Sequence, residues 1–226
     1  MTDPTFSAVL WDMDGTLVDT EPYWMDAETR LVAAWGGVWT HEDALQLIGS
    51  PLERSALILQ SRGVDLTTEE IIATLTDQVM GRLAESVPWR PGARELLLDV
   101  REAGIPTALV TMSFRRMAEQ IAGGFAPYLN GLAPFDAIIA GDEVEHGKPH
   151  PEAFLRGAAA LGIDPTDCVA IEDSEFGVAA AVASGATTVA VPSHVPLPES
   201  HAYTLWTTLA GRGLDDLAAL HARRAA

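Results

Sequence analysis

Residues 9–20 read Val9-Leu10-Trp11-Asp12-Met13-Asp14-Gly15-Thr16-Leu17-Val18-Asp19-Thr20. The apolar run that ends at Trp11 stops abruptly at two aspartates, Asp12 and Asp14, and Gly15 then turns the chain away. This pattern predicts a buried strand that carries both carboxylates at its C-terminal tip, where open α/β sheets bind their ligands. A carboxylate there can act as a nucleophile for a phosphoryl group or as a hard oxygen ligand for magnesium. A plain acidic turn is the alternative for an isolated Asp-x-Asp.

Further apolar runs along the chain have the length of buried strands. After the first run at 8–11, they lie at 107–110, 137–140, 168–171 and 188–191, with a possible edge strand near 203–206. Helical patterns separate them: an apolar face on Ala93, Leu96, Leu97 and Val100, then segments at 114–122, 151–161 and 176–184, and a last helix from about Leu214. Short apolar runs that alternate with helices indicate parallel strands joined by right-handed crossovers. The sequence therefore predicts an α/β fold with a doubly wound, Rossmann-like parallel sheet.

The segment between the first two strands has a helical pattern throughout. One helix, capped by Thr20 or Glu21, is expected to run to Trp35, and others to begin near His41, Pro51 and Thr67. Thr67 and Glu70 have the spacing of a capping box. We therefore expect residues 1–20 and 88–226 to form the α/β core, and residues 21–87 to form a small α-helical cap domain inserted after the first strand.

Composition narrows the classes of partner. Of 226 residues, 48% are hydrophobic, and the formal net charge of −18 argues against nucleic acid or an anionic membrane as a partner. No run approaches the roughly 18 apolar residues of a membrane-spanning helix. The single cysteine, Cys168, lies in an apolar run and is interpreted as buried and structural. These features predict a soluble, cytoplasmic protein, and a monomer is expected for a capped domain of this size.

Polar residues follow the predicted strands at the point where each one ends. Asp12 follows the first, Thr111 the second, and Glu172 and Asp173 the fourth. In a parallel sheet these groups share one edge, where clustered carboxylates would repel one another unless a divalent cation neutralised them. Because every candidate ligand is an oxygen, Mg²⁺ is favoured over zinc. The alternative interpretation of residues 172–174 is a simple helix cap.

Candidate phosphate-binding groups lie at the same strand ends. Thr111 offers a hydroxyl, and Met112 offers a backbone N–H. Lys148 lies in a proline-rich loop, and its ammonium could neutralise both a nucleophilic carboxylate and a phosphate oxygen. His146 and His150 of this loop are interpreted as loop or capping groups rather than as ligands or bases.

Four segments of the chain resemble the sequence motifs of the haloacid-dehalogenase superfamily of phosphohydrolases and phosphomutases. They are the segments around Asp12, Thr111, Lys148 and Glu172. The helical insertion is similar to that of the branch containing β-phosphoglucomutase and many sugar-phosphate phosphatases. The resemblance implies that Asp12 is the nucleophile that becomes an aspartyl-phosphate, and that Asp14 protonates the leaving oxygen and then activates water. It implies that Thr111 and Lys148 hold the phosphoryl group. It also implies that Mg²⁺ is bound by Asp12, the Asp14 carbonyl and Asp173, with Glu172 as a ligand or a neighbour of the ligands.

The cap sequence bears on which member of the branch this is. Trp24 stands where the β-phosphoglucomutase pattern has a histidine, and its surroundings look more like those of bacterial phosphatases acting on hexitol and deoxyhexose phosphates. Trp24 is either part of a substrate pocket or packed within the cap. The mutase's cap lysine has no clear counterpart, and Arg54 and Arg82 are the nearest candidates.

The leading hypothesis is a Mg²⁺-dependent phosphatase that hydrolyses small phosphate monoesters, of sugars or polyols, through a phosphoaspartate. A sugar phosphomutase of the β-phosphoglucomutase type is the alternative. The second alternative is a non-catalytic relative that binds a phosphorylated ligand.

Overall fold

A six-stranded sheet with β1 near its centre organises the larger part of the protein. The computed structural model describes residues 5–48, 50 and 52–224. The strand order is β3-β2-β1-β4-β5-β6, and every neighbouring pair is parallel. The strands are β1 (Ala8–Trp11), β2 (Thr107–Val110), β3 (Ala137–Ile139), β4 (Cys168–Glu172), β5 (Thr187–Ala190) and β6 (Thr204–Leu205). The predicted parallel α/β sheet is confirmed.

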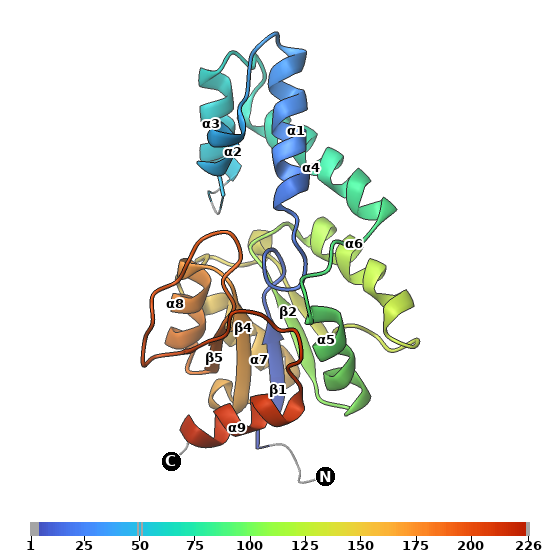
Figure 1. The fold of residues 1–226 in the computed structure, drawn as a ribbon, viewed down its shortest axis with the longest axis vertical. Coiled ribbons are helices and arrows are strands. Elements are labelled where there is room, and N and C mark those ends of the chain that lie inside the picture. Colours follow the sequence, from blue (N-terminus) through green and yellow to red (C-terminus); the bar gives the residue numbers. More distant parts are fainter. Residues whose placement is uncertain (1–4, 49, 51, 225–226) are drawn as a thin grey trace. The chain divides into compact units, whose positions relative to one another are not determined.

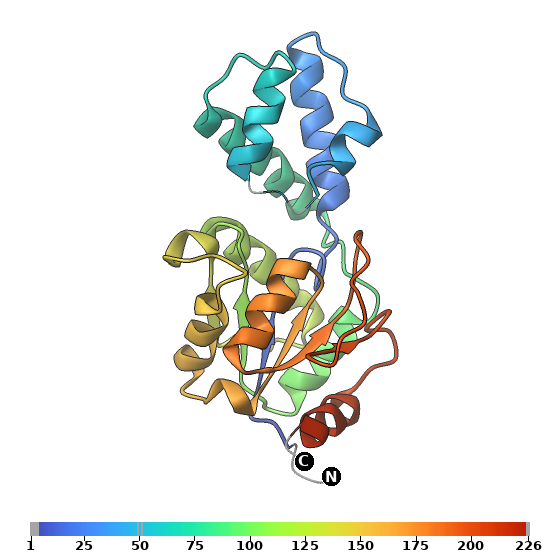
Figure 2. The same cartoon turned by 90° about the vertical axis from the view of Figure 1, so that its left-hand side faces the viewer.

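Helices cover both faces of this sheet, which explains why its central strands are apolar on both sides. On one face, α7 (Glu152–Leu161) and α8 (Glu175–Ser184) pack against each other, and α5 (Ala93–Glu102) and α9 (Leu214–Arg224) contact each other on the opposite face (Figures 1 and 2). The helix α6 (Arg115–Phe125) contacts β3. All four residues of β1 are fully buried.

The helix α7 packs closely on the central strands. Phe154 of this helix is fully buried, in a cluster with Leu10 of β1 and Val110 of β2. A Cβ atom on Gly157 would lie 2.9 Å from a Val110 methyl group, so this approach depends on the absence of a side chain there. Cys168 is buried in the same cluster, as predicted.

Residues Thr20–Ser86 form a second compact unit, separate from the unit made by Met1–Asp19 and Val87–Ala226. It consists of α1 (Glu21–Ala34), α2 (His41–Leu45), α3 (Leu52–Ser61) and α4 (Thr68–Glu85). The capping box predicted for α4 is present, since Thr67 Oγ1 accepts from Glu70 N at 3.2 Å and Glu70 Oε2 accepts from Thr67 N at 2.9 Å.

Some details at the ends of the elements differ from the prediction. The helix α1 begins after Thr20, but the Thr20 side chain makes no capping hydrogen bond because its backbone is already helical. The helix α3 begins at Leu52, and Pro51 lies outside the described residues. The strand β5 begins at Thr187, one residue earlier than expected, because Thr187 pairs with Val169 of β4.

No helix in the described part of the chain has both the length and the apolar character needed to cross a membrane.

Replacing Phe154 with alanine is expected to lower the free energy of unfolding by about 3–5 kcal/mol, because the ring fills space between α7 and the sheet. Chemical denaturation monitored by circular dichroism measures this loss. Leu155→Ala is the matched control, since Leu155 is 39% exposed on the same helix and should cost about 1 kcal/mol or less. Equal losses in the two variants would contradict this account of the core.

Candidate active site

A buried ion-pair cluster lies at the C-terminal edge of the sheet. Asp12 directly follows β1, and its backbone N–H donates to Ile171 O of β4 at 3.0 Å, which fixes the residue at the strand tip. The Lys148 ammonium donates to Asp12 Oδ1 at 2.6 Å, to Glu172 Oε1 at 2.8 Å and to the Val110 carbonyl at 2.9 Å. These three bonds use all three ammonium protons. The loop that carries Lys148 is thereby tied to the ends of β1, β2 and β4.

Burial sets the electrostatics of this cluster. It raises the pKa of the Asp12 carboxyl above its ordinary value, the Glu172 carboxylate raises it further, and Lys148 opposes the rise. Burial likewise raises the pKa of Asp173, and the carboxylates of Glu172 and Asp12 add to the effect. Burial alone would lower the pKa of Lys148, but Asp12 and Glu172 outweigh it and raise that pKa above its usual range. The ammonium is therefore charged at neutral pH.

The turn after β1 positions Asp14. Asp14 Oδ2 accepts a hydrogen bond from Ser113 Oγ at 2.6 Å. Gly15 has a φ of +85°, and a Cβ on it would lie 2.0 Å from Asp173 Oδ2. A glycine is required here on both counts, since it permits the turn and leaves room for the Asp173 carboxyl.

Glu172 and Ser174 connect the cluster to α8. Glu172 is the last residue of β4, and its Oε2 accepts from Ser174 N at 2.8 Å and from Ser174 Oγ at 3.0 Å. Ser174 Oγ in turn accepts from Gly177 N at 3.1 Å as the N-cap of α8. The helix-cap interpretation of residues 172–174 therefore holds for Ser174, whereas Glu172 pairs with Lys148.

The oxygen atoms at this edge fit a divalent cation of the magnesium type. Carboxylate oxygens of Asp12, Glu172 and Asp173 lie within 4.8 Å of one another. Asp12 Oδ2 is buried and has no hydrogen-bond partner among the described residues. Glu172 Oε1 is paired with the Lys148 ammonium, and its Oε2 already accepts two hydrogen bonds, so Asp12 and Asp173 are the better placed carboxylates for a metal ion. The set contains only oxygen donors, which suits Mg²⁺.

The segment after β2 is held against the same edge. Thr111 is buried, and its Oγ1 accepts from Ser113 N at 3.0 Å. Gly141 N donates to Ser113 O at 3.0 Å, and a Cβ on Gly141 would collide with the Met112 carbonyl. Met112 Sδ accepts from Lys148 N at 3.3 Å. Thr111, Met112 and Lys148, the predicted phosphate-binding residues, are therefore neighbours in the structure.

The three candidate substrate residues of the cap all belong to the helical unit Thr20–Ser86. Trp24 is half-buried on α1, and Arg54 is exposed on α3. Arg82 of α4 lies 5.5 Å from the centre of the Tyr23 ring and 3.6 Å from the Glu85 carboxylate. Within this unit, Arg82 and Tyr23 share a groove between α1 and α4.

Two contributions to the site were missing from the sequence-based prediction. Ser113 contacts Asp14, and the Val110 carbonyl accepts from Lys148. The polar run Thr111-Met112-Ser113 was a usable signal for Ser113, because a serine three residues beyond a strand end lies near the other strand tips. A backbone carbonyl leaves no signal in the sequence.

Comparison with known proteins identifies the family to which the chain belongs. The family model of haloacid dehalogenase-like hydrolases matches residues 6–185. The chain belongs to the haloacid dehalogenase-like hydrolase family.

Individual members of this family are similar along most of the chain. Fructose-1-phosphate phosphatase YqaB of Escherichia coli (strain K12) is 34% identical over 190 residues, which cover 82% of this chain and 96% of that protein. Bifunctional riboflavin kinase/FMN phosphatase of Arabidopsis thaliana is 33% identical over 201 residues, which are 88% of this chain but 51% of that protein. The chain thus spans about half of this longer relative. The crystal structure of CbbY from Rhodobacter sphaeroides in complex with xylulose-(1,5)bisphosphate matches with a TM-score of 0.81 and 28% identity, covering 94% of this chain and 99% of that one.

Replacing Lys148 with methionine is expected to lower the free energy of unfolding by about 3–5 kcal/mol at pH 8, because Asp12 and Glu172 would stay buried without a counter-charge. The loss should be smaller at pH 5. Without the ammonium the folded-state pKa of Asp12 rises further, so stability is retained at low pH and falls as the pH increases through that pKa. Denaturant titration at both pH values measures the difference.

The double variant Lys148→Met/Asp12→Asn is the control for this prediction. Removing one carboxylate charge together with the ammonium should recover part of the stability at pH 8. Equal losses at pH 5 and pH 8 would show that Lys148 contributes packing rather than charge compensation.

Proposed function

We propose that this chain is a Mg²⁺-dependent phosphatase that hydrolyses small phosphate monoesters of sugars or polyols through a phosphoaspartate on Asp12. The observation that carries the proposal is the state of Asp12 at the tip of β1. One of its oxygens lies 2.6 Å from the Lys148 ammonium, and the other is buried without a hydrogen-bond partner among the described residues. Such a carboxylate has one oxygen held by the ammonium and one available to a ligand.

In the proposed reaction, an Asp12 oxygen attacks the phosphorus and the bond from phosphorus to the ester oxygen breaks. Asp14 donates its proton to the departing alkoxide, which leaves as an alcohol. Asp14, now ionised, removes a proton from water, and the resulting hydroxide attacks the phosphorus. The bond to Asp12 then breaks and releases inorganic phosphate. The 2.6 Å hydrogen bond from Ser113 would hold the Asp14 carboxyl in position for both transfers.

The proposed roles of the other residues follow from charge. Lys148 would attract the phosphoryl oxygens by its charge, since its three protons are already donated within the cluster, and Thr111 and Met112 N–H would donate hydrogen bonds to them. Asp12, Asp173 and the Asp14 carbonyl would hold Mg²⁺, which supplies positive charge to the phosphoryl oxygens when it is bound. Glu172 would act by holding Lys148, since its oxygens are already occupied.

Sugar phosphates are the proposed substrates because the relatives point to them. YqaB is named a fructose-1-phosphate phosphatase, and the CbbY structure contains a sugar bisphosphate. The helical unit Thr20–Ser86 would act as a cap that selects the substrate, with Trp24, Arg54 and Arg82 as candidate contacts. Arg54 and Arg82 are the proposed sources of positive charge in that unit.

We expect inorganic phosphate to be released from sugar and polyol monophosphates with Mg²⁺, and release to stop when a chelator is added. Asp12→Asn should lower turnover about a thousandfold or more, because an amide is a poor nucleophile for phosphorus. A malachite green assay over sugar, polyol and nucleotide monophosphates measures both effects.

Asp167→Asn is the matched control for that experiment. Asp167 is exposed and directly precedes β4, at the opposite edge of the sheet from Asp12. Full turnover in Asp12→Asn would refute the assignment of Asp12 as the nucleophile. Transfer of phosphate to a second sugar only when a bisphosphate activator is present would indicate a mutase.

Mg²⁺ is expected to raise the midpoint of thermal unfolding more at pH 8 than at pH 5. In the metal-free protein the raised pKa values of Asp12 and Asp173 keep protons on the folded chain, so stability is lost as the pH rises from about 4 through the folded-state values. Mg²⁺ stabilises the ionised carboxylates and offsets this loss. Differential scanning fluorimetry measures this midpoint. Asp173→Asn should reduce the rise caused by Mg²⁺, whereas Asp167→Asn should not.

A further inference from the structure

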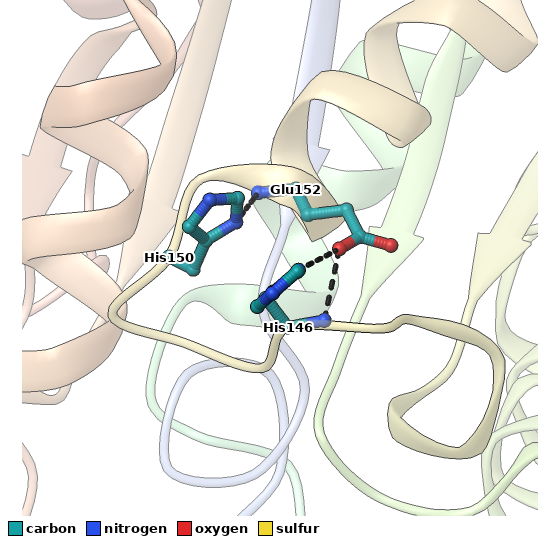
Figure 3. Close-up of side chains that lie close together, drawn as sticks. All are labelled: His146, His150 and Glu152. Carbon is teal, nitrogen blue, oxygen red and sulfur yellow. Dashed lines mark hydrogen bonds and ion pairs between the residues drawn. The ribbon is translucent and has the colours of Figure 1, made fainter.

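Two histidines of the loop before α7 lie beside Glu152, the first residue of that helix, outside the carboxylate cluster (Figure 3). His146 and His150 are exposed, and Glu152 is half-buried. His146 Nδ1 lies 3.3 Å from Glu152 Oε2, and the centres of the two imidazole rings are 4.7 Å apart. One ligand atom from each residue lies within 4.8 Å of the others. Solvent ions can therefore reach a compact group of two nitrogens and one carboxylate oxygen.

The backbone fixes the Glu152 carboxylate in this group. Its Oε1 accepts from Glu145 N and its Oε2 from His146 N, each at 2.9 Å. These two hydrogen bonds lower the pKa of Glu152 to about 2, so it is ionised at neutral pH. The Arg156 guanidinium lies 3.5 Å from Oε1, whereas Oε2 faces the His146 ring. The carboxylate thus presents one oxygen toward the histidines.

The donor set selects a different class of metal from the one proposed for Asp12. Two imidazoles and one carboxylate suit Zn²⁺, Co²⁺, Ni²⁺ and Cu²⁺, whereas Mg²⁺ prefers oxygen alone. Ligand atoms of a tetrahedral zinc site lie roughly 3.3 Å apart, given Zn–N and Zn–O distances of about 2.0 Å. The contact between His146 Nδ1 and Glu152 Oε2 already has this length.

The third ligand requires a small movement. His150 Nδ1 accepts from Glu152 N at 3.3 Å, a long hydrogen bond at an exposed position. Binding of a metal ion through Nδ1 would replace this bond. Because the ring is exposed, its rotation toward the other two ligands meets little resistance from packing.

We propose that His146, His150 and Glu152 form a binding site for a divalent transition-metal ion of the zinc type, separate from the Mg²⁺ site. Water completes its coordination, as the exposure of both histidines allows. The site is adjacent to the catalytic cluster along the chain, because Lys148 lies between the two histidines. His150 N donates to Gly147 O at 3.0 Å and closes this short turn. A metal ion bound to both histidines would hold the two ends of the turn that carries Lys148.

Titration with Co²⁺ tests the proposal directly. We expect the intact protein, in excess Mg²⁺ to occupy the oxygen site, to bind one Co²⁺ with the intense visible absorption of a four-coordinate ion. Zn²⁺ should displace it. His146→Ala and His150→Ala should each weaken Co²⁺ binding at least about tenfold, since even residues that merely support a metal ligand cost this much. His201→Ala is the matched control, because His201 is also an exposed histidine and lies far along the chain from this loop.

Three results would overturn the proposal. One is a protein that binds no Co²⁺, and another is binding that survives both His146→Ala and His150→Ala. The third is binding that is lost in Asp173→Asn, which would place the ion at the carboxylate cluster. Thermal unfolding of the metal-free variants identifies any that fail to fold, and His150→Gln then replaces such a variant. None of these readouts uses phosphate release, so they are independent of the proposed phosphatase activity.

Discussion

The hydrogen bonds of the buried Lys148 ammonium are the interactions on which the candidate active site, at the C-terminal ends of the strands, depends. They join a loop to the ends of three neighbouring strands, through Asp12 after β1, the Val110 carbonyl on β2 and Glu172 on β4. A lysine with three short hydrogen bonds and two carboxylate partners can be buried at acceptable cost, whereas either carboxylate alone could not. The same contacts bring together residues that are 136 positions apart in the sequence.

This arrangement leaves more negative than positive charge at the site. Asp12, Asp14, Glu172 and Asp173 face one lysine, and burial raises the pKa of Asp12 and Asp173. A phosphate ester would be repelled both here and by the net charge of −18. The proposed Mg²⁺ resolves both problems, because one divalent ion compensates the carboxylates and attracts the phosphoryl group. The His146, His150 and Glu152 group is chemically distinct, since its nitrogens suit a softer ion.

Most of the fold could be predicted from local patterns. The strand at Ala8–Trp11 and the helix start at Leu214 agree with the structure, because apolar runs and helix periodicity reflect burial that the whole fold enforces. The shift of β5 to Thr187 and the missing side-chain cap at Thr20 could not be predicted, since they depend on a neighbouring strand and on one backbone conformation. Ser113 was overlooked for a similar reason: its partner, Asp14, is 99 residues away.

By itself, the sequence determined the class of fold, the helical insertion and the residue types at each strand end, because alternating apolar runs and polar tips follow from burial in a parallel sheet. Only the tertiary structure decided which of these residues are partners. It assigned Glu172 to Lys148 and Ser174 to the helix cap, and it left one Asp12 oxygen unpaired among the described residues. It also placed His146 and His150 beside Glu152, apart from the carboxylate cluster. Hydrogen bonds and ion pairs depend on distances of a few tenths of an ångström between distant segments, and spacing along the chain does not encode such distances.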